Sequence, residues 1–155
     1  RIILKITALQ APAMIDRLYE ASEHGVQIDL IVRGICCLIP GQSYSRNIRV
    51  TRIVDTFLEH ARIWYFGNGG NPKLFLGSPD WMRRNLYRRI EAVTPILDPD
   101  VKQELIDMLS IQLSDKRKAC FVDENLRNCW KSAHPQKEKV RSQYTFYEYL
   151  KEKTE

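Results

Sequence analysis

Short apolar runs typical of buried strands alternate along this chain with segments of helical period. The run Ile2–Ile6 is followed by a segment of helical period that opens at Pro12 and ends at Gly25, and then by a second apolar run at residues 26–32. A strand, a helix and a strand in succession form a crossover between parallel strands, and the functional loops of such sheets lie at the carboxyl ends of the strands. The pattern therefore predicts an α/β domain with a partly parallel sheet, and it places Arg33 at the functional edge.

The same alternation continues through the rest of the chain. The apolar residues Ile48, Val50, Ile53 and Val54 lead into a short element of unassigned type. Strands expected at residues 63–66 and 74–76 flank a turn rich in glycine and asparagine, which indicates a hairpin. The turn is not a P-loop, because Lys73 is not followed by Ser or Thr. Further along, we expect a helix capped by Ser78 that runs through Arg84, and a strand at residues 90–97. A long helix opens at Asp98 and Pro99, and its inward-facing residues are Val101, Leu105, Met108 and Leu109. A last strand is expected at residues 118–122, followed by a terminal amphipathic helix whose apolar face carries Val140, Tyr144, Tyr147 and Leu150.

Length and composition favour one compact domain that covers residues 1–155. The chain is 44% hydrophobic, and a chain of this size buries roughly two-thirds of its unfolded surface in a single core. No stretch approaches the roughly 20 apolar residues that span a bilayer, and no secretory leader precedes the first strand. We therefore expect a soluble cytoplasmic protein, with the periphery of the inner membrane as the alternative location. Because Arg1 leads directly into a strand, we also expect the chain to be a fragment of a longer one.

Charge and cysteine content narrow the kinds of partner. The 24 Lys and Arg residues outnumber the 19 Asp and Glu residues, so the formal net charge is +5. A positive surface favours an anionic partner such as a phosphate or a nucleic acid. The four cysteines show no CxxC spacing and no histidine pair at i, i+4, so we expect reduced thiols and no metal site within the chain.

Three histidines are available for chemistry, and one of them stands out. His24 ends the first predicted helix, where an imidazole can interact with the helix dipole. His134 lies in a polar loop and has no predicted role. His60 follows the apolar run at residues 53–58 and precedes a buried strand, so we expect it at a strand edge beside the glycine hairpin.

The order of residues after His60 resembles a half-motif of the phospholipase D superfamily. In that half-motif His-x-Lys is followed by Asp or Asn and then by Gly-Ser. Here Arg62 stands where Lys is usual, and the pair Gly77 and Ser78 comes later than usual.

A longer series of motifs resembles the polyphosphate kinases in order and spacing over nearly the whole chain. The motifs are Leu30-Ile31-Val32-Arg33-Gly34-Ile35-Cys36-Cys37-Leu38-Ile39-Pro40-Gly41, Phe57-Leu58-Glu59-His60, Asp80-Trp81-Met82, Arg84-Asn85, Arg89-Ile90-Glu91 and Ser142-Gln143. Those enzymes contain several domains, of which the last two are phospholipase-D-like, and they transfer the terminal phosphate of ATP reversibly onto polyphosphate. The resemblance implies that this chain is the second of those two domains, with a phospholipase-D-like mixed sheet flanked by helices.

The resemblance also implies roles for particular residues. Arg33 and His60 would contact the nucleotide phosphates, with His60 as the second catalytic histidine, and Arg89 would face the same tunnel. The phosphorylated histidine and the Mg²⁺ ligands of the family lie in the preceding domain, so this chain alone is expected to be inactive. Thr7 stands where Asn is usual and the loop at residues 42–46 is shorter than typical, and both departures concern the rim of the tunnel.

The implied partners are ATP or ADP, inorganic polyphosphate, the preceding domains of the same polypeptide and further copies of the full-length enzyme, with no nucleic acid expected. Phosphoryl transfer depends mainly on positioning and charge neutralisation, which suits an arginine at a strand end and a helix N-terminus near Ser78. Arg33 can bind a phosphate through two hydrogen bonds. The nearby Arg83, Arg84, Arg88 and Arg89 cannot all lie on one helix face.

Two other functions remain open on the sequence. The chain could be a phospholipase-D-like phosphodiester hydrolase or nuclease whose two half-sites come from two copies. It could instead be a non-catalytic module that binds nucleic acid or another polyanion, in which case binding would depend on salt and be independent of His60.

Overall fold

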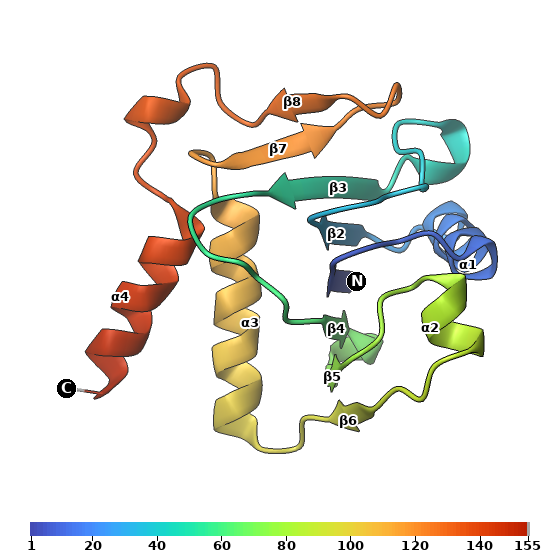
Figure 1. Cartoon of the computed structure of the whole chain (residues 1–155), viewed down its shortest axis with the longest axis horizontal. Helices are drawn as coiled ribbons and strands as arrows, with labels where there is room; N and C mark the ends of the chain where they lie inside the picture. Colours follow the sequence, from blue (N-terminus) through green and yellow to red (C-terminus); the bar gives the residue numbers. More distant parts are fainter. Residues whose placement is uncertain (155) are drawn as a thin grey trace.

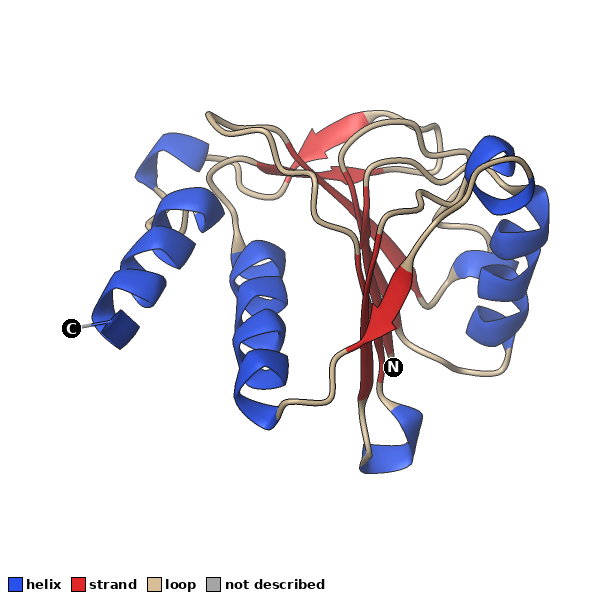
Figure 2. Ribbon diagram, turned by 60° about the horizontal axis from the view of Figure 1, so that its bottom comes forward, coloured by secondary structure: helices blue, strands red, loops and turns tan. Residues whose placement is uncertain are grey.

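One mixed sheet of eight strands runs through the molecule, and helices cover both of its faces (Figures 1 and 2). The computed structural model describes residues 1–154. Across the sheet the strands lie in the order β6-β5-β4-β1-β2-β3-β7-β8. Strand β2 is parallel to both β1 and β3, and the other neighbouring pairs are antiparallel. The predicted class, an α/β fold with a mixed sheet and flanking helices, is confirmed.

The elements follow one another as the alternating sequence pattern predicts, with local exceptions. The strands are β1 (Ile2–Ile6), β2 (Ile28–Val32), β3 (Ile48–Ile53), β4 (Ile63–Phe66), β5 (Lys73–Gly77), β6 (Val93–Pro95), β7 (Ala119–Val122) and β8 (Asn128–Trp130). The helices are α1 (Pro12–Glu23), α2 (Arg83–Tyr87), α3 (Pro99–Ser114) and α4 (Ser142–Thr154), with short 3-10 turns η1 (Ser43–Ser45), η2 (Asn68–Gly70) and η3 (Pro135–Lys137).

Local sequence signals account for the helix ends that were predicted correctly. Pro12 occupies the first turn of α1, and Gly25 ends the helix with a φ of 82°, a conformation that glycine adopts without steric cost. The Asp98 side chain accepts hydrogen bonds from the backbone N–H groups of Asp100 and Val101, at 2.9 and 3.0 Å, and so caps α3.

Each face of the sheet carries its own apolar core. Leu4 and Leu30 belong to the core on the α1 face, and both are 0% exposed. Ile3 and Ile31 belong to the core on the α3 face, together with Leu109 of α3. Because side chains alternate along a strand, a central strand covered on both faces is mostly apolar, which is why β1 and β2 are apolar at every position except Lys5 and Asp29.

Three predicted elements differ from the structure. No helix begins at Ser78, and residues 79–82 belong to no helix, with Trp81 in a β-bridge to Leu9. The strand expected at residues 90–97 is reduced to β6 at the edge of the sheet, and its three residues are exposed. The strand at residues 118–122 is not the last, because the chain turns back into β8, whose three residues are also exposed and show no apolar alternation.

Two predicted apolar helix faces are also partly wrong. Val101 of α3 is 47% exposed, and Tyr144 and Tyr147 of α4 are 43% and 63% exposed. Helix α4 packs against α3 rather than against the sheet, so only a narrow stripe of its surface is covered. All four cysteines are free thiols. Within residues 1–154, none of the helices has both the length and the apolar character that crossing a membrane requires.

A buried ion pair joins three separate segments on the α1 side of the sheet. Asp80 accepts hydrogen bonds from Arg62 Nε at 3.1 Å and Nη2 at 2.9 Å, and the two residues are 5% and 9% exposed. The same carboxylate accepts from the backbone N–H groups of Thr7 and Ala8, at 2.7 and 3.0 Å. It therefore holds the end of β1, the start of β4 and the segment before α2 together.

Hydrogen bonding decides the protonation of this carboxylate. Burial raises the pKa of Asp80, but the hydrogen bonds from Arg62, Ala8 and Thr7 outweigh burial, and the net pKa lies below the usual value for Asp. A group whose pKa is lowered by folding contributes stability that is present above its unfolded pKa, about 3.9, and is lost as the pH falls through the folded pKa.

We predict that Asp80→Asn lowers the free energy of unfolding at neutral pH by about 3 to 5 kcal/mol, because it leaves the Arg62 charge buried without a carboxylate. The variant should also lose less stability than the parent chain when the pH falls below about 4. Urea denaturation at a series of pH values measures both effects. The matched control is Asp16→Asn at an exposed position of α1, which should change stability by less than about 0.5 kcal/mol. Equal effects of the two substitutions would contradict a structural role for this ion pair.

Candidate functional site

The candidate site lies where the carboxyl ends of β1 and β2 meet the amino end of β4. Strands β1 and β2 are parallel, so Lys5 and Arg33 come to the same edge of the sheet. Strand β4 is antiparallel to β1, with Ile63 opposite Lys5, so the segment before β4 reaches that edge as well. The topology therefore brings Arg33 and His60, which are far apart in sequence, to one end of the central strands.

The backbone around Arg33 is fixed on both sides. The N–H of Gly34 donates to the Thr7 carbonyl at 2.8 Å, and a Cβ at position 34 would lie only 2.9 Å from that oxygen, so the close approach requires glycine. From β3, Arg52 donates through Nη2 to the Gly34 carbonyl at 2.9 Å and through Nε to the Val32 carbonyl at 3.5 Å. These contacts fix the backbone on either side of Arg33 and therefore the point from which its side chain extends.

The Arg33 guanidinium has no carboxylate partner within residues 1–154. Its Nε is buried and makes no hydrogen bond there. A buried donor without a partner costs free energy, and a bound anion would remove that cost. Arg33 is thus placed as the sequence predicted, after β2, with its charge available to a ligand.

His60 is exposed, and its ring makes no hydrogen bond within the described part of the chain. Its backbone carbonyl accepts a hydrogen bond from Arg62 Nη1 at 3.1 Å, so the Asp80–Arg62 pair also fixes the backbone of His60. The expectation that His60 lies beside the glycine hairpin is wrong. The hairpin joins the other end of β4 to β5, and Gly67 contacts Arg1 at the beginning of β1, so β4 separates the hairpin from His60.

The position of Arg62 in the His-x-Lys pattern does not give it the role of a free cation. Its Nε and Nη2 donate hydrogen bonds to the buried Asp80 carboxylate, and its Nη1 donates to the His60 carbonyl. Arg62 therefore positions backbone at the site and is not available to bind phosphate.

A second buried ion pair forms the floor of the site. Lys5, 5% exposed, pairs with Glu59, which also accepts hydrogen bonds from Gln112 and Gln143. Burial and the nearby charge of Arg33 lower the pKa of Lys5, while Glu59 raises it, and the net shift is downward. Burial raises the pKa of Glu59, but the charge of Lys5 and the three hydrogen bonds outweigh it, and the net pKa is lowered. Since Glu59 neutralises Lys5, the charge of Arg33 remains uncompensated.

Sequence reasoning missed Lys5, Glu59 and Arg52 as contributors to the site. The signal for Lys5 is its position in an otherwise apolar run, because a lysine in a strand covered on both faces requires a buried partner. Neither Glu59 nor Arg52 has such a local signal, since the contacts of both cross between segments that are distant in sequence.

Arg89 and Ser78 are not joined to Arg33 or His60 by any contact within residues 1–154. Arg89 is exposed just beyond α2. The pKa of the nearby Glu91 is lowered mainly by hydrogen bonds from Ser78 and Asn85, and the charge of Arg89 adds a smaller effect in the same direction. The Ser78 hydroxyl binds the Glu91 carboxylate and accepts from the Ala92 N–H at 3.0 Å. A phosphate site at a helix N-terminus near Ser78 is therefore wrong, because no helix begins there.

Within residues 1–154, no group of three or more His, Cys, Asp and Glu side chains is arranged to hold a metal ion. The carboxylate of Glu59, which directly precedes His60 in the sequence, is already bound by Lys5 and two amides. The residues of the candidate site therefore do not fit a Mg²⁺ ion.

Comparisons with known proteins agree with one another on the family to which the chain is similar. Residues 1–143 match the family model described as polyphosphate kinase C-terminal domain 2. The chain is 46% identical over 151 residues to the polyphosphate kinase of Escherichia coli K12, which covers 97% of this chain and 22% of that protein. It is 55% identical over 120 residues to the polyphosphate kinase of a Synechocystis species, which covers 77% of this chain and 16% of that protein. The chain thus spans about a fifth of the length of the curated relatives it matches.

Solved structures support the same conclusion. The crystal structure of polyphosphate kinase from Porphyromonas gingivalis superposes with a TM-score of 0.94 at 55% identity, over 98% of this chain and 23% of that one. Nuc, a phospholipase D family member from Salmonella typhimurium, superposes with a TM-score of 0.56 at 15% identity over 84% of this chain and 82% of that one, and this likeness shows the fold alone. The resemblance in sequence motifs is thereby confirmed: the fold is phospholipase-D-like, and the chain belongs to the family of the second C-terminal domain of polyphosphate kinases.

Proposed function

We propose that this chain is one half of an active site that transfers the terminal phosphate of ATP reversibly to inorganic polyphosphate. The preceding domain of the same polypeptide would supply the other half, including a histidine that carries the phosphate between the two substrates. The observation that carries the proposal is the arrangement of Arg33, an arginine without a carboxylate partner, at the same open edge of the sheet as His60. Membership in the polyphosphate kinase family supports the choice of substrates.

In this proposal each residue of the site has a distinct task. The Arg33 guanidinium binds phosphate oxygens and offsets the negative charge that two phosphorylated groups bring together. The phosphoryl group leaves ADP as it bonds to the histidine nitrogen of the other domain, and it leaves that nitrogen as it bonds to the terminal oxygen of polyphosphate. His60 acts beside the phosphohistidine as an acid, or as a hydrogen-bond donor to phosphate oxygens, and an imidazole suits either task because its ordinary pKa of about 6.5 lies near neutrality.

The remaining parts of the site are assigned to other segments. Mg²⁺, which neutralises charge on nucleotide phosphates when bound, would take its ligands from the preceding domain, since the residues of this site do not fit it. Arg89 is proposed to face the same tunnel from the segment after α2. The full-length enzyme is proposed to be a homo-oligomer in the cytoplasm.

The ion pair of Arg62 argues against phosphodiester hydrolysis by two copies of this chain. Arg62 stands at the Lys position of the His-x-Lys pattern, but it is bound to the Asp80 carboxylate and is not free to bind the phosphate of a diester. The likeness to NucT from Helicobacter pylori at 11% identity and to Nuc from Salmonella typhimurium at 15% identity shows the fold alone.

The first prediction concerns the chain by itself. The isolated chain should fold, as judged by circular dichroism, and should form no polyphosphate from ATP above the background of the assay, because the phosphate-carrying histidine lies in another domain. Robust turnover by the isolated chain would contradict a site shared between two domains.

The second prediction concerns Arg33. In the full-length enzyme Arg33→Ala should raise the Michaelis constant for ATP. The rise should correspond to a loss of binding free energy of about 1.5 to 3 kcal/mol, the scale of hydrogen bonds to charged groups. Initial rates at varied ATP measure the change. The control is Arg49→Ala, an exposed arginine of β3 that lies opposite Asp29 in the strand register, near the beginning of β2 and at the opposite end of the sheet. Kinetics unchanged in a folded Arg33→Ala enzyme would remove Arg33 from the site.

The third prediction concerns His60. In the full-length enzyme His60→Ala should lower kcat on the order of 100-fold or more, the usual scale for a positioned acid or base. His60→Gln keeps a hydrogen-bond donor but cannot transfer a proton, so activity retained by Gln indicates a donor and activity lost in both variants indicates an acid.

The control is His24→Ala, because the His24 ring forms a hydrogen bond with the Glu20 carbonyl at the end of α1, at 2.8 Å, and lies on another element than His60. It should leave kcat within about twofold of the parent enzyme. Loss of activity in His24→Ala together with full activity in both His60 variants would place the catalytic histidine elsewhere.

A further inference from the structure

The segment that carries His60 has little apolar packing to hold it. We call residues 54–62, between β3 and β4, the His60 loop. It contains no helix or strand, and Val54, Phe57 and Leu58 are 60%, 60% and 70% exposed. A cavity of about 240 Å³ lies between this loop and helices α3 and α4, lined by Phe57, His60, Met108 and Phe146 among others. Polar contacts must therefore determine the position of the loop.

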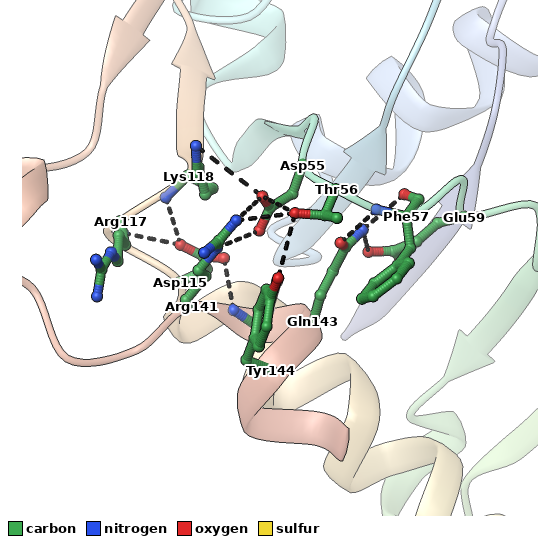
Figure 3. Close-up of polar contacts among 11 residues, drawn as sticks. Asp55, Thr56, Phe57, Glu59, Asp115, Arg117, Lys118, Arg141, Gln143 and Tyr144 are labelled. Carbon is green, nitrogen blue, oxygen red and sulfur yellow. Dashed lines mark hydrogen bonds and ion pairs between the residues drawn. The ribbon is translucent and has the colours of Figure 1, made fainter. Parts of the chain in front are cut away.

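One side-chain amide supplies three of those contacts. Gln143, in the first turn of α4, accepts a hydrogen bond from the Phe57 N–H at 2.8 Å and donates to the Phe57 carbonyl at 2.8 Å (Figure 3). Its Nε2 also donates to Glu59 Oε1 at 3.0 Å. Gln143 thus satisfies both backbone groups of one loop residue and orients the carboxylate that directly precedes His60.

An ion pair between a partly exposed arginine and a buried carboxylate holds the beginning of the same loop. Arg141 donates to the Asp55 carboxylate through Nε at 2.8 Å and through Nη2 at 2.6 Å, and the Asp55 side chain is 1% exposed. Nη2 also donates to Thr56 Oγ1 at 2.9 Å. The hydrogen bonds from Arg141 lower the pKa of Asp55, although burial opposes them. The pair therefore stays charged at neutral pH and fixes the point at which the loop leaves β3.

The two residues that hold the loop are themselves anchored to α3. Asp115, 0% exposed, follows the last residue of α3 and accepts a hydrogen bond from the Ser142 N–H at 2.8 Å. The same carboxylate accepts from the N–H groups of Arg117 and Lys118, both at 2.8 Å. Asp115 thereby fixes the start of α4 between Arg141 and Gln143, and Figure 3 shows the contacts continuing from Asp115 to the loop.

From these contacts we propose that Gln143 is a positioning residue for His60, with Arg141 and Asp55 as its support. The proposal rests on the proposed function, since it gives Gln143 a role only through His60. The His60 ring makes no hydrogen bond within residues 1–154, so its location depends on the backbone that carries it. Gln143 and Arg62 hold that backbone from opposite sides, at Phe57 and at the His60 carbonyl. A displacement of about 1 Å at a catalytic group can cost on the order of 100-fold in rate.

A double-mutant cycle in the full-length enzyme tests this role. Gln143→Leu keeps the approximate size of the side chain and removes its three hydrogen bonds. In the enzyme with His60 intact it should lower kcat by about 10-fold to 100-fold, with the Michaelis constant for ATP changed less than about twofold. In the His60→Ala background the same substitution should change kcat less than about twofold, because no imidazole remains to be positioned.

Two further variants guard against a general loss of structure. Gln103→Leu removes an exposed glutamine that donates a hydrogen bond to Asp107 on α3, at 2.8 Å, and it should leave kcat unchanged. Gln143→Glu keeps the acceptor for the Phe57 N–H and removes the donor to the Phe57 carbonyl and to Glu59, so it should lower kcat as Gln143→Leu does. Thermal melting identifies any variant that fails to fold, and the cycle is then run with the other.

The outcomes separate this proposal from the one on which it rests. Equal fold-losses for Gln143→Leu with and without His60 would overturn the positioning role and leave the catalytic role of His60 intact. A kcat within twofold of the parent in both Gln143 variants would overturn it as well. Full activity in His60→Ala would overturn the proposed function, and the positioning role with it.

Discussion

The buried contact between Arg62 and Asp80 is the interaction on which the arrangement of the site depends. One carboxylate binds the arginine that precedes β4 and the two backbone N–H groups that follow β1, so three segments distant in sequence meet at one point. Without the Asp80 carboxylate, these donors would lose their hydrogen-bond acceptor inside the protein. The resulting loss of free energy would be a large fraction of the small net stability of a domain of this size. The pair also explains why no helix begins directly after Ser78. Asp80 is bound at the centre of the fold, and the helix starts only beyond it, at Arg83.

Three carboxylates at this edge of the molecule each pair with a cation, whereas Arg33 has no such partner within residues 1–154. Asp80 fixes Arg62, Glu59 fixes Lys5, and Asp55 fixes Arg141. Each pair neutralises a cation that would otherwise compete for an anionic ligand. Arg33 differs because its backbone is fixed by Thr7 and Arg52 while its charge has no carboxylate within residues 1–154. A positive group already held in place binds an anion at low entropic cost, which is the property that a phosphate site requires.

Predictions succeeded where the signal was local. The run Ile2–Ile6, the helix opened by Pro12 and the Asp98 cap each depend on neighbouring residues, and each lies where the sequence indicates it. The failures involve contacts across the fold. Ser78 looks like a helix cap but binds Glu91, and the exposed strand β8 has no apolar alternation and exists only because β7 offers it an edge.

The sequence by itself determined the alternating elements, the basic charge and the motifs that show the polyphosphate kinase family, because these depend on residue types and short spacings. It also singled out Arg33 and His60. Only the tertiary structure decided which charged residues neutralise one another, that Arg62 is occupied and Arg33 is not, and that Gln143 reaches back 86 residues to hold the backbone before His60. The physical reason is that an ion pair or a hydrogen bond depends on distances of a few ångströms between side chains, and these distances exist only after the sheet has brought its strand ends together.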